Sequence, residues 1–331
     1  MTTIQASRSA DTAPRPTGTP VPPAGPTWRQ RLSQWDFRWS PYLYVLPFFL
    51  LFAAVGLYPM VYSGYLSFFS WPRYGVTHGE GVGFANYAHV LTDPVFHKAF
   101  WNTVGIFLLS SVPQVVIATV IAAMLDTPLR GRTWWRMSVL LPFVVAPAAT
   151  ALIFGSIFAD RTGLANELLR AVGLSGIEWH SDRFASWTAI ATMVNYRWTG
   201  YNTLIILAAL QAIPRQLYEA AAMDGASRVE QFFHVTLPSI RPTMLFVIIT
   251  ATIGGMQIFT EPRLFDTNLQ FQGGADYQYL TLTMYVFNTS NSGTDPYPRA
   301  AAATWIIVLI IVAIALVNYL VTRQVQRRSE R

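Results

Sequence analysis

The chain has 331 residues, of which 52% are hydrophobic and only 12% are charged. A typical soluble domain carries roughly 25% charged residues, so this composition favours a protein that resides in a membrane. The net charge of +6 comes almost wholly from arginine, since Lys98 is the only lysine. The basic residues are scattered along the chain and form no single basic face, which argues against nucleic-acid binding.

The first 40 residues are polar and hold six prolines between Pro14 and Pro26. They contain no apolar run of the kind that a cleavable signal peptide requires. We expect residues 1–40 to be a disordered, proline-rich cytoplasmic tail, either a plain tether or a docking ligand. Residues 323–331 carry four arginines and are expected to form a basic cytoplasmic tail.

Apolar segments long enough to cross a bilayer, which takes about 20 residues, recur along the chain. They cover residues 42–68, 101–125, 137–158, 186–210, 243–261 and 301–322. The predicted fold is therefore all-α, a membrane domain of six transmembrane helices over residues 41–322. Prolines interrupt several segments, at Pro47, Pro59, Pro113, Pro142 and Pro147, and membrane helices tolerate them where neighbours satisfy the freed backbone groups.

The distribution of basic residues predicts the orientation, because cytoplasmic segments near span ends collect lysine and arginine. With both termini inside, 15 basic residues lie on inner segments and seven on outer segments, while Arg197 lies within a span. We therefore expect both termini in the cytoplasm. The same topology places the loop 211–242 in the cytoplasm.

The first half of that loop, 211–242, has the pattern of a short helix and a bend. Pro214 suits the start of a helix, and residues 217–223 are a run of good helix formers. Asp224 and Gly225 are expected to end this helix, because glycine readily adopts the left-handed conformation found after many helices.

The second half of the loop predicts another helix. Ser227 is followed three residues later by Glu230, which is the pattern of a capping box. Leu237 and Pro238 are expected to stop this helix. Two helices joined at a glycine bend form either a projection that fits a groove on another protein or an amphipathic hairpin resting on lipid.

The residues of this loop also resemble a known family. The spaced pattern Glu219-Ala220-Ala221, Asp224-Gly225-Ala226, Leu237-Pro238 and Pro242 resembles the EAA motif of permease subunits in binding-protein-dependent ABC importers. Trp198, Thr199, Gly200 and the run from Leu207 to Pro214 resemble the carbohydrate branch of that family. The first span, Leu46 to Phe69, is similar to the first permease of each pair, the MalF-like or UgpA-like subunit. The resemblance covers roughly residues 42–322.

The resemblance implies a type I ABC importer permease in the bacterial plasma membrane, surrounded by membrane lipid. It also implies three partners: a second permease in a heterodimer, a dimer of ATP-binding ATPase subunits and an extracytoplasmic solute-binding protein. The loop would dock on the ATPase through Glu219, Ala220, Ala221, Asp224, Gly225, Ala226, Leu237 and Pro238. Glu219 would pair with a basic residue there, and Gly225 would allow the bend.

ATP hydrolysis is expected on the partner, together with bound ATP and magnesium. This chain has no Gly-Lys-Ser/Thr phosphate loop, since Lys98 lies between His97 and Ala99. We therefore expect a transport subunit that binds no cofactor or metal and has no catalytic residues. A membrane enzyme is a weaker alternative, because no histidine, aspartate or cysteine lies deep in the spans beside serines such as Ser110 and Ser111.

Polar residues inside predicted spans are candidates for the path of a solute. They are Asn195, Tyr196, Arg197, Trp198, Tyr201 and Asn202 in the fourth span, and Gln257, Thr260 and Glu261 in or beside the fifth. Aromatic faces beside amide groups suit sugar rings, so we expect a carbohydrate, such as a disaccharide or another oligosaccharide. Two alternatives stay open: a glycerol-3-phosphate-like solute with Arg197 as its anion partner, and a secondary transporter that works without ATP.

Arg197 requires its own explanation, because a charge at a helix centre costs about 2.5 to 3.5 kcal/mol on insertion scales. It is either a substrate-contacting or gating residue in a cavity, or a structural partner of an acid in the second permease. The family pattern usually has an uncharged residue at this point. A secondary transporter would predict ion-coupled residues and an internal repeat, and neither is visible in the sequence.

Overall fold

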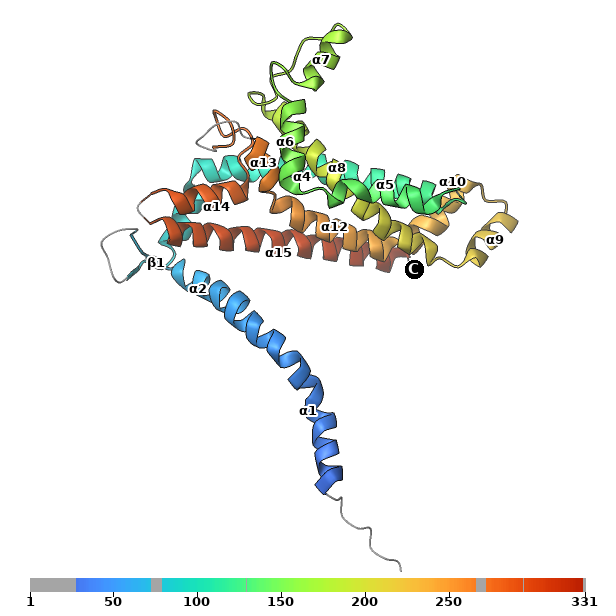
Figure 1. Ribbon diagram of the computed structural model, residues 1–331, viewed down its shortest axis with the longest axis horizontal. Helices are drawn as coiled ribbons and strands as arrows, with labels where there is room; N and C mark the ends of the chain where they lie inside the picture. Colours follow the sequence, from blue (N-terminus) through green and yellow to red (C-terminus); the bar gives the residue numbers. More distant parts are fainter. Residues whose placement is uncertain (1–27, 73–78, 129, 266–271, 294, 330–331) are drawn as a thin grey trace, which may run out of the picture. The chain divides into compact units, whose positions relative to one another are not determined.

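The structure is a computed structural model that describes residues 28–72, 79–128, 130–265, 272–293 and 295–329. It is built almost entirely of helices (Figure 1). The chain divides into two compact units, residues 1–60 and 61–331. Part of the expected disordered tail, 1–27, lies outside the described residues. The rest of that expectation is wrong, because residues 28–40 belong to a helix.

The described part of the first unit is a helix that continues past its prolines. Helix α1 (Trp28–Leu51) passes through a π-helical stretch, η1 (Phe52–Leu57), into α2 (Tyr58–Leu66), which ends in the second unit. The stretch Trp39–Leu66 has a mean hydropathy of 2.0, and residues 41–62 are all exposed. So much exposed apolar surface suits lipid or another membrane subunit and not water.

The second unit opens with a short hairpin and is organised around α4. Strands β1 (Phe69–Ser70) and β2 (Glu80–Gly81) pair antiparallel and lead to α3 (Ala85–Thr92). Asp93 caps α4 (Pro94–Asp126) by accepting a hydrogen bond from the amide of Val95 at 2.8 Å. Helix α4 contributes residues to all three hydrophobic clusters of the unit, so it is the central element of the bundle.

The third predicted span, 137–158, is a broken helix. Helices α5 (Arg132–Val144) and α6 (Pro147–Ile157) meet at an angle of 87°. Pro147 stands in the first turn of α6, where a missing backbone N–H costs little. Pro142, by contrast, lies inside α5 and does not end it.

The fourth predicted span, 186–210, lies within one long helix. Helix α8 (Arg183–Gln211) packs along α4 and α5, and Asp182 caps it by accepting from the amide of Ala185 at 2.7 Å. Its 29 residues extend about 44 Å at 1.5 Å per residue, which exceeds the thickness of a bilayer core.

The loop after α8 consists of short helices. They are α9 (Arg215–Met223), α10 (Arg228–Gln231), the π-helical η2 (Phe232–Thr236) and α11 (Leu237–Ser239). Helix α12 (Arg241–Met256) follows at an angle of 68° to the stretch Arg228–Ser239. The second loop helix therefore ends one residue after the predicted stop at Leu237 and Pro238.

Three helices complete the unit: α13 (Thr260–Phe265), α14 (Leu282–Asn291) and α15 (Pro296–Ser329). Helix α15 packs against α3, α12 and α14 and covers the sixth predicted span, 301–322. It continues to Ser329, so residues 323–329 of the expected basic tail are helical.

Hydrophobicity and length support part of the six-span prediction. Among the described residues, three helices are long and apolar enough to cross a membrane, Trp39–Leu66, Pro94–Asp126 and Pro296–Leu320. The count reaches five if each bent pair is one span. Helix α8 is not among them despite its length, so the count of six and the orientation stay predictions.

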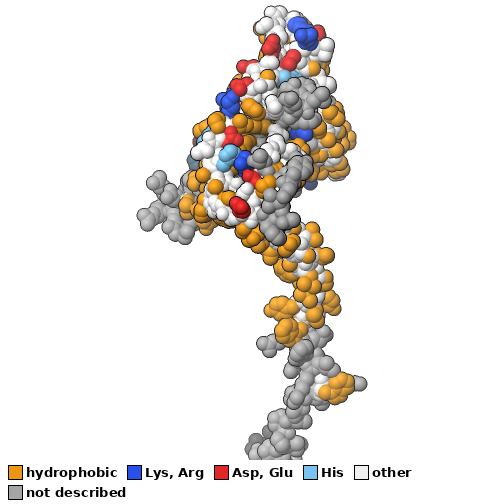
Figure 2. Space-filling model, turned by 90° about the vertical axis from the view of Figure 1, so that its left-hand side faces the viewer, with side chains coloured by type: hydrophobic (Ala, Val, Ile, Leu, Met, Phe, Trp, Pro, Cys, Tyr) orange, Lys and Arg blue, Asp and Glu red, His pale blue; other side chains and the backbone are white. Residues whose placement is uncertain are grey.

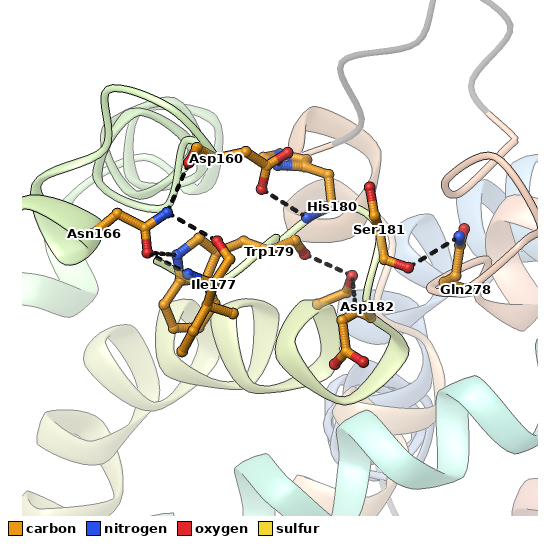
Figure 3. A network of polar contacts seen from close by, with 9 residues as sticks. Asp160, Asn166, Ile177, Trp179, His180, Ser181, Asp182 and Gln278 are labelled. Carbon is orange, nitrogen blue, oxygen red and sulfur yellow. Dashed lines mark hydrogen bonds and ion pairs between the residues drawn. The ribbon is translucent and has the colours of Figure 1, made fainter. Parts of the chain in front are cut away.

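The segment between α6 and α8 contains α7 (Leu164–Ala171) and is held by a polar network (Figure 3). The buried amide of Asn166 donates to the carbonyl oxygens of Asp160 and Ile177, both at 2.8 Å, and accepts from the Trp179 indole at 3.1 Å. The amide of Gln278 donates to the carbonyl of Ser181 at 3.3 Å. These bonds give the segment a defined shape.

Within the second unit, α9 and α14 lie at opposite ends of the bundle (Figure 1). Figure 2 looks toward the α14 end and shows lysine, arginine, aspartate and glutamate side chains gathered there, with hydrophobic side chains along the flanks. A charged end and apolar flanks fit a bundle that crosses a bilayer.

Candidate functional site

A cavity of about 420 Å³ lies among α4, α8, α12 and α13, within the range typical of small-molecule sites. Most of the predicted path residues line it: Arg197, Trp198, Tyr201, Asn202, Gln257, Thr260 and Glu261. Helix α8 presents four of these side chains, and the other three lie between the end of α12 and the start of α13. Segments 64 residues apart in sequence, at Arg197 and Glu261, therefore form one site.

Two predicted path residues are not part of the cavity wall. The ring of Tyr196 lies 5.2 Å from that of Phe154 on α6, and its side chain is exposed. The side-chain oxygen of Asn195 is buried and has no hydrogen-bond partner among the described residues. These residues precede Arg197 on α8 and point to other faces of the helix.

An aromatic cluster forms one wall of the cavity. The rings of Trp198 and Tyr201 lie 5.8 Å apart at 87°, and both contact Phe143 on α5, which stacks on Tyr201 at 4.8 Å. Phe143 itself is outside the lining and fixes the two rings from behind. Within the described residues, the Tyr201 hydroxyl and the Trp198 indole N–H make no hydrogen bond, so both remain available to a solute.

A pair of amides forms the α4 side of the cavity. Asn202 on α8 donates to the side-chain oxygen of Gln114 on α4 at 2.8 Å, and both residues are buried. We did not predict Gln114 or Ser111 as path residues, although both line the cavity. Gln114 lies within the second predicted span, so the rule that polar residues inside spans are functional candidates also indicates this residue.

Arg197 forms an ion pair within the chain. Its Nη1 donates to Oε1 of Glu261 at 3.0 Å, and each side chain is less than a tenth exposed. The acid that pairs with Arg197 therefore lies in this chain, whereas the structural alternative above placed it in the second permease. Helix α12 ends at Met256, and the turn that follows brings Glu261 of α13 back onto α8.

The predicted two-helix loop is present at the other end of α8. Helix α9 has no buried residues, and Glu219 and Ala220 are exposed on it. Gly225 adopts a φ of +83° after the helix, as expected for a left-handed closing residue. The Tyr218 hydroxyl lies 2.9 Å from that of Thr236, which ties α9 to η2.

The capping box at the start of α10 is also present. The Ser227 amide donates to Oε2 of Glu230 at 2.7 Å, and the Glu230 amide donates to the Ser227 hydroxyl at 3.3 Å. The hydrogen bond from the Ser227 backbone amide, and to a lesser extent a hydrogen bond with the Ser227 hydroxyl, lower the pKa of Glu230 below its ordinary value of 4.5. The box thus fixes the direction of the second helix as it leaves the bend.

A small hollow of about 290 Å³ separates the two loop helices. Four predicted coupling residues line it, Ala221, Asp224, Gly225 and Ala226, whereas Glu219, Ala220, Leu237 and Pro238 do not. The loop therefore offers an exposed helix, a carboxylate on it and a concave face beside it.

Known proteins with similar sequences are membrane transport components. Residues 98–331 match the family described as binding-protein-dependent transport system inner membrane component. A lactose transport system permease of Rhizobium radiobacter is 33% identical to this chain, and the match covers 86% of this chain and 94% of that permease. An arabinooligosaccharide permease of Halalkalibacterium halodurans is 34% identical over 68% of this chain and 71% of its own. An sn-glycerol-3-phosphate permease of Yersinia enterocolitica is 29% identical over 85% of this chain and 93% of its own.

The fold is also shared with a solved structure. A chain from the crystal structure of a bacterial ABC transporter involved in the import of alginate superimposes with a TM-score of 0.74 and 21% identity. The match covers 89% of this chain and 99% of the other. The chain therefore belongs to the family of binding-protein-dependent transport system inner membrane components, and it is a membrane transport permease and not an enzyme.

Proposed function

We propose that this chain is one of two permease subunits of an ATP-driven importer that carries a carbohydrate, such as a disaccharide or another oligosaccharide. The cavity supplies the chemistry for such a cargo. The rings of Trp198 and Tyr201 can stack on the apolar faces of a sugar, and the amides of Asn202 and Gln257 can bond its hydroxyls. The similar permeases named for lactose and arabinooligosaccharides support the same class of cargo.

One observation carries the proposal: the exposed loop connects the two walls of the cavity. Helix α8, which bears Arg197 and Trp198, runs directly into α9, and the loop leads through α12 to Gln257 and Glu261. A partner that moves the loop would therefore displace one cavity wall against the other. For ATP to drive transport, the docked loop must differ in free energy between the inward and outward states.

ATP and magnesium would bind on a separate ATPase, with Glu219 pairing with a basic residue in its docking cleft. The second permease would complete the path through the membrane, and an extracytoplasmic solute-binding protein would deliver the cargo. Both termini and the loop 211–242 would face the cytoplasm. The exposed apolar surface of residues 41–62 would face lipid or the second permease.

The test is a reconstitution of this chain with its second permease, ATPase and binding protein in proteoliposomes. Uptake of labelled lactose and arabinobiose is measured with and without ATP. We expect ATP-dependent uptake of a neutral sugar, and Glu219→Lys should reduce it at least about tenfold while ATP hydrolysis continues, because the reversed charge repels the basic partner.

Asp126→Lys is the matched control. Asp126 is also exposed and predicted to be cytoplasmic, and its ion pair with Arg132 at 3.5 Å is of the kind that contributes little. Reversing its charge should leave uptake near the wild-type rate. Normal uptake by Glu219→Lys would count against a coupling role for the loop, and uptake by this chain alone along an ion gradient would contradict the importer.

A further inference from the structure

The chemistry of the cavity indicates whether its cargo is neutral or anionic. The names of similar proteins do not, because they include solutes of both kinds. Those names include lactose and arabinooligosaccharides, which are uncharged, and sn-glycerol-3-phosphate, which is an anion. Arg197 would be the natural partner of an anion in this cavity. Its charge is already neutralised by Glu261 at 3.0 Å.

No other charged side chain among the described residues lines the cavity. Besides Arg197 and Glu261, the lining consists of apolar residues, glycines, amides, hydroxyls and the rings of Trp198 and Tyr201. The wall that this chain supplies is therefore electrically neutral. An anion beside Arg197 would also meet the Glu261 carboxylate, and it would have to separate a buried ion pair whose two ends would then lack compensation.

The pair still has free hydrogen-bonding groups. The Nε of Arg197 is buried without a partner among the described residues. Within the same residues, Oε2 of Glu261 accepts no hydrogen bond from the chain, since its contact with Arg197 uses Oε1. A donor on one residue and an acceptor on the other suit neighbouring hydroxyl groups, each of which both donates and accepts. A phosphate or carboxylate group is a poorer fit because it has no proton for the Glu261 carboxylate.

We propose that the Arg197–Glu261 pair is a specificity determinant that makes this cavity a site for an uncharged polyhydroxy solute and excludes anions. The guanidinium and carboxylate bind hydroxyl groups while Trp198 stacks on the ring. Arg197 lies 5.9 Å from the Trp198 ring centroid, so polar and stacking contacts are placed side by side. This inference rests on the proposed function, because it concerns the cargo that crosses by this path.

The first experiment measures the affinity of the cavity itself. The complex of both permeases and the ATPase is purified without the binding protein, and solute binding is followed by tryptophan fluorescence. The signal from the cavity is the difference between the wild type and Trp198→Phe, because the chain has 11 tryptophans. The probes are lactose and arabinobiose as neutral solutes and glycerol 3-phosphate as the anion. We expect the anion to bind at least about tenfold more weakly than the better neutral probe.

Two single variants should move selectivity in opposite directions. Glu261→Gln leaves the Arg197 charge unpaired, so affinity for glycerol 3-phosphate should rise about tenfold relative to the neutral probe. Arg197→Gln leaves the Glu261 charge unpaired, so the affinity for the cationic sugar glucosamine should rise about tenfold relative to the neutral probe. The double variant Arg197→Gln with Glu261→Gln restores neutrality and should exclude both ions again.

Arg263→Gln is the matched control. Arg263 is close to Glu261 on α13 but does not line the cavity, so removing its charge should leave the selectivity unchanged. Assembly of each variant is checked by size-exclusion chromatography. If a single variant fails to assemble, the ratio of the affinities for the anionic and neutral probes, measured in the wild type and in the double variant, still tests the proposal.

The proposal is overturned if the wild type binds glycerol 3-phosphate as tightly as the neutral probes, or if the assembled variants leave selectivity unchanged. These outcomes are distinct from failure of the proposed function, which would appear as a lack of any ATP-dependent uptake. An importer that works with ATP but carries an anion would retain the function and reject this inference.

Discussion

At the scale of single residues, Gly200 shows how closely α8 approaches α5. A Cβ at this position would overlap the carbonyl oxygen of Val139, and that backbone atom cannot move away as a flexible side chain could. Gly200 also precedes Tyr201, whose ring stacks on Phe143 of α5. The small residue thus allows the helix contact that holds the aromatic wall of the cavity in place.

We expect Gly200→Ala to destabilise the protein by about 1 to 3 kcal/mol, as forced overpacking does. The measurement is the thermal midpoint of the purified complex, together with sugar uptake. Gly155→Ala is the control, because Gly155 also lies in a helix but a Cβ there meets nothing within 4 Å. A midpoint that falls equally for both variants would contradict the steric explanation.

Gly225 is required for a different reason, its backbone conformation. A Cβ there would meet nothing within 4 Å, but φ is +83°. An L-residue other than glycine costs roughly 1 to 2 kcal/mol in such a conformation, and asparagine is among the residues that tolerate it best. We expect Gly225→Ala to reduce ATP-driven uptake and to raise amide hydrogen exchange in α9, and Gly225→Asn to do so less. Equal effects of alanine and asparagine would show that the conformation of the bend is unimportant.

At the scale of elements, the capping box of α10 predicts a dependence on pH. The folded-state pKa of Glu230 is lowered, so its contribution to stability is present above the unfolded value of 4.5. The contribution is lost as the pH falls through the lowered folded pKa. We expect the amides of Ser227 and Glu230 to exchange faster with solvent below about pH 4, after correction for the intrinsic rate.

Glu230→Gln separates the charge from the geometry of the box. Glutamine can still accept a hydrogen bond from the Ser227 amide, so the helix start should form but without the additional exchange at low pH. If the wild type and Glu230→Gln respond to pH in the same way, the Glu230 charge is not responsible for the effect.

Helix α8 shows why apolar content alone misses one predicted span. Its polar side chains are turned inward: Asn202 meets Gln114 on α4, and Arg197 meets Glu261. The hydropathy average counts these groups as though they faced lipid. A helix that lines a polar cavity can therefore be long enough to span the bilayer and still be less apolar than the other spans.

At the scale of the whole molecule, the orientation can be tested directly, because the chain has no cysteine. Single cysteines are introduced at Met223 at the end of α9 and at Val172 at the end of α7, both of which are exposed. With both termini inside, a membrane-impermeant maleimide should label Val172→Cys in intact cells. It should label Met223→Cys only after the membrane is opened.

The opposite labelling pattern would show that the topology is the reverse of the predicted one and that the loop lies outside the cytoplasm. Denatured samples provide the control, since both cysteines must then react to the same extent. Labelling of both positions in intact cells would indicate a leaky membrane.

The local features of this protein could be predicted from its amino-acid sequence. Runs of apolar residues predicted helices, the Ser227 and Glu230 spacing predicted a capping box, and Gly225 predicted the bend. These features depend on neighbours along the chain, so their physics is visible in the sequence. The motif that begins at Glu219 indicated the family for the same reason, because its residues all lie within the one loop that ends at Pro242.

Which polar residues share a cavity depends instead on the packing of the helices. The turn after Met256 carries Glu261 back to Arg197, and Gln114 meets Asn202 across two helices. Tyr196 has the same polar character as Tyr201 but faces α6. Side-chain partners depend on how helices rotate and where they break, which is set by packing over long sequence separations. The charge of Arg197 was therefore evident from the sequence, and its neutralisation was not.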